Sequence, residues 1–488
     1  MLKPSDKAKL VTRHDALSFQ LEAVEAIKNM KYAALFHEQG LGKTKIALDL
    51  TLEWLKTDAV DCVIVVTKKA LVANWLAEVN RHTFLRARVL GQDHRANFFA
   101  FNSAARLFIT HYEVFLNEEN RLKTFLRTRR VGVILDESQK IKNPDTDLAK
   151  AFHRLSDGFE RRVIMTGTPV ANRPYDIWSQ VFFLDKGRSL GEDFSAFKEH
   201  LDLTNQLWED HDRRERFEQA LAAIFSKLSS FAVRKTKATS GISLPEKIIQ
   251  NIDAKMEAKQ AELYEAFRRD LRSEVLKGGQ LVEDDAEAVL KRLTRLVQVA
   301  SNPLLVDEGY CGVPGKFPVL LNLLHDARDQ GAKAIVWTSY VENVRWLARQ
   351  LGKFVPALIH GSLSIEDRNA SATRFMSDDD TRILIATPGA AKEGLTLTVA
   401  NRAIFYDRSF SLDDYLQAQD RIHRISQTET CYVQNIIAEG TIDEWVDALL
   451  TAKRLAAQLA QADISPEEYR EQANYEFGRL VAEILGAD

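Results

Sequence analysis

The sequence predicts an α/β protein built from two parallel-sheet lobes joined by helices, and two observations support this fold class. Short apolar runs alternate with polar or amphipathic stretches between residues 30 and 185, and the same scheme returns between residues 334 and 437. Parallel strands with crossover helices produce this alternation. The chain has 488 residues, which is more than one compact core usually holds. We therefore expect α/β lobes at residues 1–190 and 321–450.

The apolar runs define the expected strands. Those of the first lobe are YAALF, CVIVVT, LFIT, VGVILD and RRVIMT, and those of the second are AIVWT, VPALIH, RILIAT, RAIFYD and CYVQNII. Each run is short and is followed by a polar or amphipathic stretch, as a strand in a βαβ unit requires.

The stretch between the lobes has a different composition. Strand signals vanish between about residues 190 and 320, where Glu, Lys, Ala, Leu and Arg dominate. The run AKMEAKQAELYEAFRRDLRSEVLKGG contains good helix formers and ends on Gly278 and Gly279, a typical helix stop. The run EDDAEAVLKRLTRLVQVA opens acidic and turns basic, as a helix dipole prefers. We predict helical insertions over residues 191–320 and C-terminal helices over residues 451–488.

Composition argues against several classes of protein. The three cysteines lie far apart without a CxxC pair, so neither a zinc module nor a disulfide framework is indicated. No apolar run approaches the length that spans a bilayer. The net charge of −3 says little about nucleic acid, because a local basic stripe matters more than the average. Basic clusters exist at residues 121–130, 161–162 and 233–237, with solvated helix faces as the alternative explanation.

A glycine-rich stretch, HEQGLGKTK, lies at residues 37–45 between the first expected strand and an amphipathic run. Unpaired N–H groups and the positive end of a helix dipole point outward at such a junction, which favours phosphate. Gly40, Gly42, Lys43 and Thr44 fit the end of a phosphate-binding loop, in which the lysine meets the β and γ phosphates and the threonine ligates Mg²⁺. The full pattern has glycine at position 37, where this chain has histidine. A chance GKT remains the alternative for this motif alone.

A second motif is VGVILDESQ, at residues 131–139. The buried run ends in two adjacent carboxylates, which places Asp136 and Glu137 at the C-terminal edge of a parallel sheet, where ligands bind. Asp136 can then hold Mg²⁺ while Glu137 orients and deprotonates the attacking water. Two solvated loop acids are the alternative, and the upstream GKT loop disfavours it.

A third motif is QAQDRIHRISQ, at residues 417–427. Arg421 and Arg424 are three residues apart on an expected helix, so they share a face. Two guanidinium groups there could reach a γ-phosphate held by the other lobe and stabilise the transition state. In isolation, a salt-bridged helix is the more common explanation of such a pattern.

The order of these motifs resembles the Swi/Snf-type DNA translocases, which are helicase-like ATPases of superfamily two. The likeness covers about residues 15–450 and rests on the ordered segments LSFQLEAV, HEQGLGKT, VIVVTKKALVANWLAEV, LFITHYEVF, LDESQKIKNPDT, MTGTPVANRPYDIWS, AIVWTSY, IHGSLSIEDR, ATPGAAKEGLTLTVANRAIFYD and QAQDRIHRISQ. It implies two tandem RecA-like lobes, ATP and Mg²⁺ as cofactors, and double-stranded DNA as the partner.

The resemblance also implies roles for individual residues. The nucleotide is expected to contact Gln20, which reads adenine, together with Gly40, Leu41, Gly42, Lys43, Thr44 and Gly394. The metal ligands are Thr44 and Asp136, and the catalytic residues are Lys43, Asp136, Glu137, Arg421 and Arg424. The expected nucleic-acid contacts are Asn74, Trp75, Thr110 and His111 in the first lobe, and Thr338, Ser339, His360, Gly361 and Thr387 in the second.

Several positions depart from the family pattern. The family usually has Asp-Glu-Ala-His at the acid motif, but Ser138 and Gln139 follow the two acids here. Gln139 replaces a histidine that relays the state of the nucleotide to the segment MTGTP, so the resemblance predicts altered coupling and intact hydrolysis. Further departures are His37 in place of an acid, and residues 410–412 in place of Trp-Asn-Pro. We interpret these changes as a divergent branch, because the acids, the loop lysine and the two arginines are present.

The predicted function is ATP-dependent translocation along double-stranded DNA without reading of its sequence, because contacts to phosphate and sugar give position only. An RNA helicase of the same superfamily and a non-catalytic scaffold with a helicase-like fold are the alternatives. The basic KIKNP after the acid motif favours the DNA branch. We also expect a minimal bacterial or phage form that acts as a monomer in the cytoplasm, without a membrane anchor.

Overall fold

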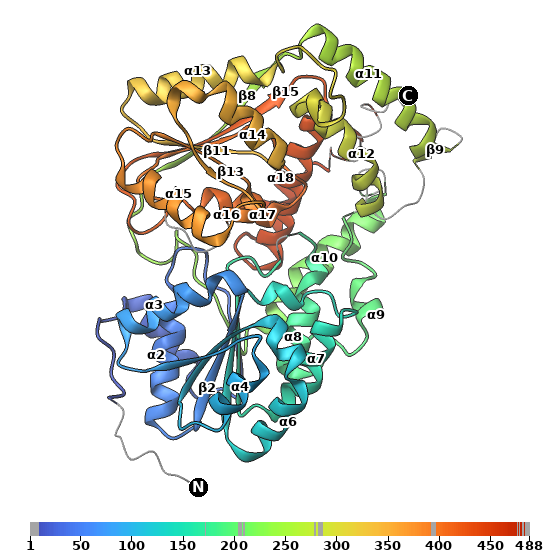
Figure 1. Ribbon diagram of the computed structural model, residues 1–488. Coiled ribbons are helices and arrows are strands. Elements are labelled where there is room, and N and C mark those ends of the chain that lie inside the picture. The colour runs from blue at the N-terminus through green and yellow to red at the C-terminus, as the bar shows by residue number, and fades with distance from the viewer. Residues whose placement is uncertain are drawn as a thin grey trace. The chain divides into compact units, whose positions relative to one another are not determined.

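The computed structural model describes residues 9–170, 172–203, 207, 210–277, 280–281, 286–391, 397–475, 477, 479–480 and 483. The chain divides into two compact units, each built on one parallel sheet, as the sequence predicts (Figure 1). Lobe 1 comprises Met1–Leu201, Ala220–Ile242 and Ala460–Asp463, and lobe 2 comprises Asp202–Gln219, Ser243–Leu459 and Ile464–Asp488.

The sheet of lobe 1 has seven parallel strands in the order β3-β4-β2-β5-β6-β1-β7. Their bounds are β1 Tyr32–Leu35, β2 Cys62–Thr67, β3 Ala87–Leu90, β4 Leu107–His111, β5 Val131–Asp136, β6 Arg161–Met165 and β7 Ala232–Val233. The five expected strands are all present. β3 and β7 were not expected, because β3 exposes its two central residues and β7 has only two residues.

Helices cover both faces of this sheet (Figure 1). One face packs against α1 Ser18–Ile27, α2 Lys43–Lys56 and α3 Val72–His82. The other carries α5 Tyr112–Asn117, α6 Glu119–Thr128, α7 Asp147–Leu155 and α8 Ile177–Asp185, while α4 His94–Phe101 lies beside β3. Contacts among the rings of Phe115, Phe152 and Phe183 join α5, α7 and α8: the first two rings are stacked, and Phe183 meets Phe152 edge to face. The central strands β2, β4 and β5 are buried on both faces, which explains their continuous apolar runs.

The sheet of lobe 2 has six parallel strands in the order β12-β13-β11-β14-β15-β8. Their bounds are β8 Lys247–Ala254, β11 Ala334–Trp337, β12 Ala357–Ile359, β13 Ile383–Ala386, β14 Arg402–Phe405 and β15 Cys431–Ala438. One face packs against α13 Lys316–Asp329 and α14 Val341–Gln350, and the other against α15 Ile365–Ser377, α16 Pro388–Ala391 and α17 Leu412–Gln419. All five strands expected in this lobe are present.

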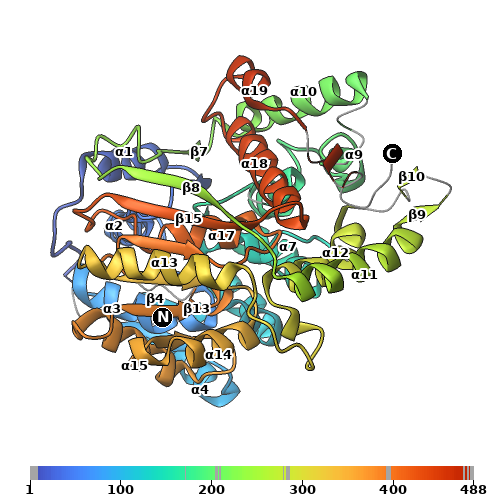
Figure 2. The same cartoon turned by 90° about the horizontal axis from the view of Figure 1, so that it is seen from above.

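The expectation of purely helical insertions over residues 191–320 is wrong in one respect. The segment does contain α9 Phe194–Lys198, α10 His211–Leu228, α11 Ala258–Val275 and α12 Ala286–Ser301, with a short antiparallel pair, β9 Leu276–Lys277 and β10 Gln280–Leu281. However, it also supplies β7 to one sheet and β8 to the other. β8 runs along the whole of β15 as an edge strand (Figure 2). Its sequence, KIIQNIDA, mixes polar and apolar residues because an edge strand is half exposed, and the apolar-run criterion missed it.

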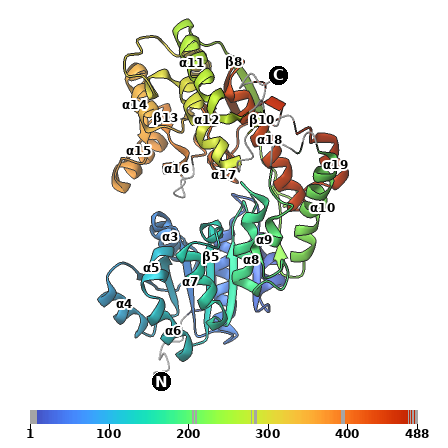
Figure 3. The ribbon, with the colours of Figure 1, turned by 90° about the vertical axis from the view of Figure 1, so that its right-hand side faces the viewer.

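The C-terminal part of lobe 2 is helical, with α18 Ile442–Ala460 and α19 Pro466–Gln472. A capping box at Ser465 and Glu468 begins α19. Glu218, in the first half of α10, accepts hydrogen bonds from Arg470 and Tyr475 at 3.0 Å each, so α19 lies beside this part of α10 (Figure 3). None of the helices in the described part of the chain combines the length and the apolar character that crossing a membrane demands. The expected helix stop at Gly278 and Gly279 lies outside the described residues.

Candidate nucleotide site and nucleic-acid surface

The glycine-rich loop connects β1 to α2, as the sequence predicts. Gly40 and Gly42 have φ values of 84° and 72°, a left-handed conformation that favours glycine, and Gly42 is the N-cap of α2. Lys43 bends back over the loop, where its Nζ donates hydrogen bonds to the carbonyl oxygens of His37, at 2.9 Å, and Glu38, at 3.3 Å. The loop therefore holds the lysine ammonium among carbonyl oxygens that a phosphate group can replace.

Gln20 fixes the loop from the side of α1. Its Nε2 donates to the carbonyl oxygen of Leu41 at 3.2 Å, and its Oε1 accepts from the backbone N–H of Leu17 at 3.0 Å. A Cβ atom on Gly42 would lie 2.5 Å from Nε2 of Gln20, so this position needs glycine for space as well as for its backbone angles. The expected adenine-reading residue thus also supports the phosphate loop.

Asp136 ends β5 and is buried, with 8% of its surface exposed. Its Oδ2 accepts hydrogen bonds from Thr67 Oγ1 at 2.9 Å and from Trp75 Nε1 at 2.7 Å, while Oδ1 makes none among the described residues. Burial raises the pKa of Asp136 to about 6, and the charge of Glu137 adds to the rise. Tyr112 donates its hydroxyl to the carbonyl oxygen of Asp136 at 2.7 Å. Hydrogen bonds to Oδ2 thus hold the carboxylate in place, and Oδ1 can bind a ligand.

Glu137 has an unusual backbone for its residue type. Its φ of 55° and ψ of 50° lie in the left-handed region, which is uncommon for residues other than glycine. Its carboxylate lies 3.5 Å from Nζ of Lys68 and accepts a short hydrogen bond from Nε2 of Gln139. The turn directs Glu137 away from the strand axis, immediately after the buried Asp136.

The segment after β6 lies between the loop and the acids. In the sheet β6 separates β5 from β1, so the acids, residues 166–170 and the glycine-rich loop follow three adjacent strands. A Cβ atom on Gly167 would lie 2.3 Å from Cγ of Gln39 and 3.1 Å from Nζ of Lys43. The carboxyl ends of parallel strands form the ligand-binding edge of such sheets. The three motifs therefore meet at one edge, although they lie far apart in the sequence.

His37 stands where the full loop pattern has glycine. The side chain is buried, and neither ring nitrogen makes a hydrogen bond of normal geometry among the described residues. Burial, with a contribution from the charge of Lys43, lowers the pKa of His37 to about 4. The imidazole is therefore neutral at pH 7 and adds no positive charge beside the lysine.

The structure corrects the expectation that Arg421 and Arg424 share one helical face. The helix α17 ends at Gln419, and residues 421–427 form successive turns. The buried Ile422 enters the core of lobe 2, the carbonyl oxygen of Arg421 accepts from Leu397 N at 3.0 Å, and Arg424 Nε donates to the carbonyl oxygen of Asp420 at 2.9 Å. The hydrogen bond from Leu397 and the packing of Ile422 are long-range contacts that favour the end of the helix here, although the local sequence is compatible with its continuation. Arg421 is buried and Arg424 is half-buried.

Lobe 2 brings several expected nucleic-acid residues to one sheet edge. Ser339 follows β11, Gly361 follows β12 and Thr387 follows β13, and these three strands are neighbours. Gly361 is exposed and Ser339 is half-buried, whereas the side chains of Thr387 and His360 are buried. This edge therefore presents backbone and small side chains, which suit contacts to phosphate and sugar.

Burial revises the role expected of three other residues. Trp75, Thr110 and Thr338 each expose 1% or less of their surface, and Trp75 is bonded to Asp136 as described above. Thr110 donates to the carbonyl oxygen of Leu90 at 3.1 Å. Their side chains do not reach the surface to contact nucleic acid. Among the other expected nucleic-acid contacts in lobe 1, Asn74 is exposed and His111 is buried beside Glu113. Gly394, which was expected to contact the nucleotide, lies outside the described residues.

Sequence reasoning missed two sets of site residues. Thr67 orients Asp136, and its polar position at the end of a strand is the only local signal. In lobe 2, Asp407 is buried after β14 and accepts hydrogen bonds from Ser301, Thr338, Asn343 and the backbone N–H of Ser339, at 2.6 to 3.0 Å. The sequence did contain a signal for Asp407: it is an acid at the end of the apolar run RAIFYD, just as Asp136 is an acid at the end of VGVILD.

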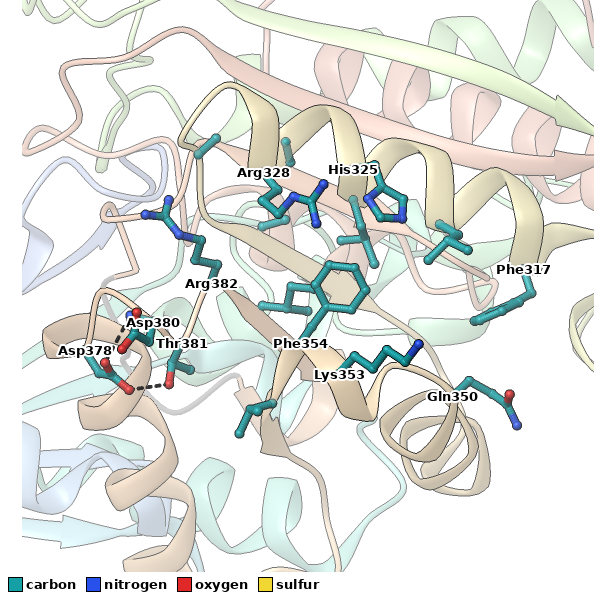
Figure 4. A pocket seen from close by; sticks show the side chains of 17 residues that line it. Phe317, His325, Arg328, Gln350, Lys353, Phe354, Asp378, Asp380, Thr381 and Arg382 are labelled. Atoms are coloured by element: carbon teal, nitrogen blue, oxygen red, sulfur yellow. Dashed lines mark hydrogen bonds between the residues drawn. The ribbon is translucent and has the colours of Figure 1, made fainter.

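A separate cavity of about 780 Å³ lies in lobe 2 (Figure 4). It is lined by the first residues of β11 and β13, Ala334 and Ile383, together with Phe354 and the cationic side chains of Arg328 and Arg382. Figure 4 shows Asp378 and Thr381 joined by a hydrogen bond at its rim. The cavity therefore opens at the amino ends of the strands and is not part of the edge described above.

Two parallel-sheet lobes, with a phosphate loop and an acid pair at one sheet edge, define the helicase-like class of nucleotide-binding proteins. The SNF2-related domain matches residues 20–305, and the helicase conserved C-terminal domain matches residues 315–426. The chain belongs to the SNF2-related family, which confirms the resemblance stated from the sequence.

The chain is similar to several curated proteins. It is 29% identical over 344 residues to YwqA of Bacillus subtilis, covering 68% of this chain and 36% of that protein. It is 24% identical over 440 residues to MG018, an uncharacterized ATP-dependent helicase of Mycoplasma genitalium, and the match covers 88% of this chain and 40% of that protein. It is 27% identical over 497 residues to the DNA repair and recombination protein RAD54-like of Gallus gallus, and the match covers 91% of this chain and 65% of that protein. The chain thus spans between 36% and 65% of the length of these relatives.

Among solved structures, the chain matches the SWI2/SNF2 ATPase core of Sulfolobus solfataricus in complex with dsDNA, with 25% identity and a TM-score of 0.41. The match covers 94% of this chain and 97% of that chain.

Proposed function

We propose that this protein is an ATP-dependent DNA translocase, which hydrolyses ATP to track along double-stranded DNA without reading its sequence, and that it acts as a monomer in the cytoplasm. One observation carries the proposal. The phosphate loop, the segment after β6 and the acid pair follow three adjacent strands, β1, β6 and β5, at the ligand-binding edge of lobe 1. Membership of the SNF2-related family supports the same chemistry.

The residues of lobe 1 fit a nucleotide with Mg²⁺. The hydroxyl of Thr44 and Oδ1 of Asp136 make no hydrogen bonds among the described residues, so both oxygens can serve as ligands of the metal. Mg²⁺ held by these two oxygens would offset the negative charge that develops on the phosphate during transfer. Lys43 exchanges its bonds to the carbonyl oxygens of His37 and Glu38 for bonds to phosphate.

Glu137 is the proposed general base. It follows the metal-binding Asp136 directly, and its left-handed backbone turns it out of the strand. A carboxylate in this position can orient a water molecule in line with the γ-phosphate and accept its proton. Lys68 and Gln139 hold the carboxylate in place. The proposed roles of Arg421 and Arg424 are to stabilise charge on the γ-phosphate when ATP draws lobe 2 towards lobe 1.

Double-stranded DNA is the proposed track. The strand ends of lobe 2 at Ser339, Gly361 and Thr387 supply backbone groups and the half-buried hydroxyl of Ser339, and Asn74 is an exposed polar group in lobe 1. Such groups suit contacts to the sugar-phosphate backbone, which do not distinguish sequences. The RAD54-like relatives are named for DNA repair and recombination, which favours DNA over RNA.

The test is an ATPase assay with no nucleic acid, single-stranded DNA, duplex DNA, forked DNA and RNA. Duplex DNA of any sequence is expected to stimulate hydrolysis most, with stimulation that falls steeply with salt because phosphate contacts release counterions. Lys43→Ala is expected to abolish hydrolysis. Stimulation by RNA alone would indicate an RNA helicase, and hydrolysis that is absent or unaffected by Lys43→Ala would indicate a scaffold.

A further inference from the structure

A polar connection fastens α8 to the turn that follows the acid pair. This turn is the short helix η2, Ser138–Ile141. Ser138 Oγ donates to Gln180 Oε1 at 2.7 Å, and Ser179 Oγ donates to the carbonyl oxygen of Ile141. Lys142 lies 2.8 Å from the carboxylate of Asp176, at the start of α8. Three polar contacts therefore tie the residues after Glu137 to one end of α8.

Gln180 extends this connection to the segment after β6. Its Nε2 donates to the carbonyl oxygens of Asp176, at 2.9 Å, and Pro169, at 3.3 Å, while its Oε1 accepts from Ser138. Neither Ser138 nor Gln180 exposes any measurable surface. A buried polar network of this kind fixes geometry strongly, because each unmade bond leaves a polar group without water.

The connection ends at the phosphate loop. Pro169 lies two residues after Gly167, which packs against Gln39 and Lys43 of the loop. A continuous path therefore runs from the acid pair through Ser138, Gln180 and residues 166–170 to the loop lysine. Each step along this path is a hydrogen bond, a covalent link or a close packing contact.

Gln139 takes no part in this path. Its amide donates to the carboxylate of Glu137, and its Oε1 is buried without a hydrogen-bond partner among the described residues. The residue that replaces the family histidine thus contacts the acid before it and makes no hydrogen bond to residues 166–170. The neighbouring Ser138, which replaces an alanine, makes the contact that leads there.

We propose that Ser138 and Gln180 are positioning residues that couple the acid pair to residues 166–170, in the place of a relay through residue 139. The proposal rests on the proposed function, because coupling has meaning only if the site binds and hydrolyses ATP. Binding of the γ-phosphate changes the partners of Lys43 and the surroundings of Glu137. Gln180, held by Ser138, conveys that change to Pro169 and the start of α8.

The first experiment does not depend on DNA. Hydrogen exchange of the full chain is followed by mass spectrometry, with and without ADP and aluminium fluoride, in peptides covering residues 163–170. The wild type is expected to show slower exchange on binding the nucleotide. Ser138→Ala and Gln180→Met are expected to lose at least half of this protection, and the conservative Ser138→Thr, which keeps the hydroxyl, is expected to retain it.

The matched control is Ser156→Ala. Ser156 is as buried as Ser138 and donates its hydroxyl to the carbonyl oxygen of His153 at 3.0 Å, so the control also removes one buried hydroxyl from lobe 1. Thermal unfolding of each variant shows how much stability is lost. Ser138→Ala and Ser156→Ala are expected to lower the melting temperature to a similar degree, with coupling impaired in Ser138→Ala alone.

The second experiment separates coupling from nucleotide binding. In the ATPase assay with duplex DNA, Ser138→Ala and Gln180→Met are expected to lower kcat about tenfold with a change in KM for ATP within about twofold, because an unmade buried hydrogen bond has an effect of this order. The double variant is expected to lose no more than Gln180→Met alone, since both residues act in one connection.

Three results would overturn the proposal: full protection of residues 163–170 in Ser138→Ala and Gln180→Met, equal loss in Ser156→Ala, or loss in Gln139→Ala with none in Ser138→Ala. Failure of the proposed function has a different signature. If only the DNA-dependent part of the function fails, the wild type hydrolyses ATP without stimulation by DNA, while the nucleotide-dependent exchange still tests Ser138 and Gln180. A wild type whose exchange over residues 163–170 does not respond to the nucleotide would overturn the coupling proposal as well.

Discussion

The buried charge of Asp136 leads to a prediction that can be worked out in detail. The folded protein raises the pKa of this carboxyl from its ordinary value of 3.8 to about 6, chiefly by burial. Between about pH 4 and pH 6 the folded state therefore binds more protons than the unfolded state. The free energy of unfolding falls as the pH rises through this window, and the loss is complete above about pH 6.

The perturbation is Asp136→Asn. Asparagine keeps an oxygen that can accept from Thr67 Oγ1 and Trp75 Nε1, so the main change is removal of the buried charge. The rise from 3.8 to about 6 corresponds to about 3 kcal/mol at neutral pH. A change of this size raises the melting temperature of a lobe-sized unit by about 5–10 °C. The variant is therefore expected to be more stable than the wild type at pH 7.5, and the proposed role of Asp136 predicts that it is inactive.

The assay is thermal unfolding of both proteins without nucleotide, from pH 4 to pH 8. The variant is expected to melt higher at pH 7.5, and the difference is expected to shrink as the pH falls towards 4, where Asp136 is protonated in the folded wild type and about half protonated in the unfolded wild type. Asp145→Asn, at an exposed position of the same lobe, is the control and is expected to have little effect. The reasoning would be refuted if the wild type were as stable as the variant at pH 7.5, or if the difference between their melting temperatures did not change with pH.

The remaining predictions concern single contacts. Trp75→Phe removes a hydrogen bond that lowers the pKa of Asp136, so the acid limb of the ATPase pH profile should move to higher pH; an unmoved limb contradicts this. Gly167→Ala places a methyl group against the phosphate loop and should raise KM for ATP at least about tenfold, whereas Gly91→Ala, in open space, should leave it unchanged. Asp407→Asn disturbs a carboxylate with four donors and should lower the free energy of unfolding by about 1–3 kcal/mol in urea titrations; unaltered stability counts against that role.

The parts of the fold that the sequence reveals are those encoded within a few residues. VGVILD and CVIVVT read as strands because both faces of a central parallel strand are buried, so the whole run is apolar. The glycine-rich loop is recognisable because Gly40 and Gly42 need left-handed backbone angles beside Lys43. The order of such segments along the chain identified the family.

Other features exist only once distant segments meet. The edge strand β8 lacks a continuous apolar run because it pairs with one strand only among the described residues and is partly exposed. The helix expected over residues 417–427 stops early because Ile422 is drawn into the core of lobe 2. Thr338 is another example. The family resemblance predicts that it contacts nucleic acid at the surface, but the packing of lobe 2 buries its side chain.

By itself, therefore, the sequence determined the two sheets, the phosphate loop and the acid pair, since each depends on residue type over a short run. Tertiary structure alone decided the partners of those groups. Trp75 meets Asp136 across 61 residues of chain, and Ser138 meets Gln180 across 42. Such pairings depend on the order of strands in the sheet and the packing of helices upon it, which no local pattern records.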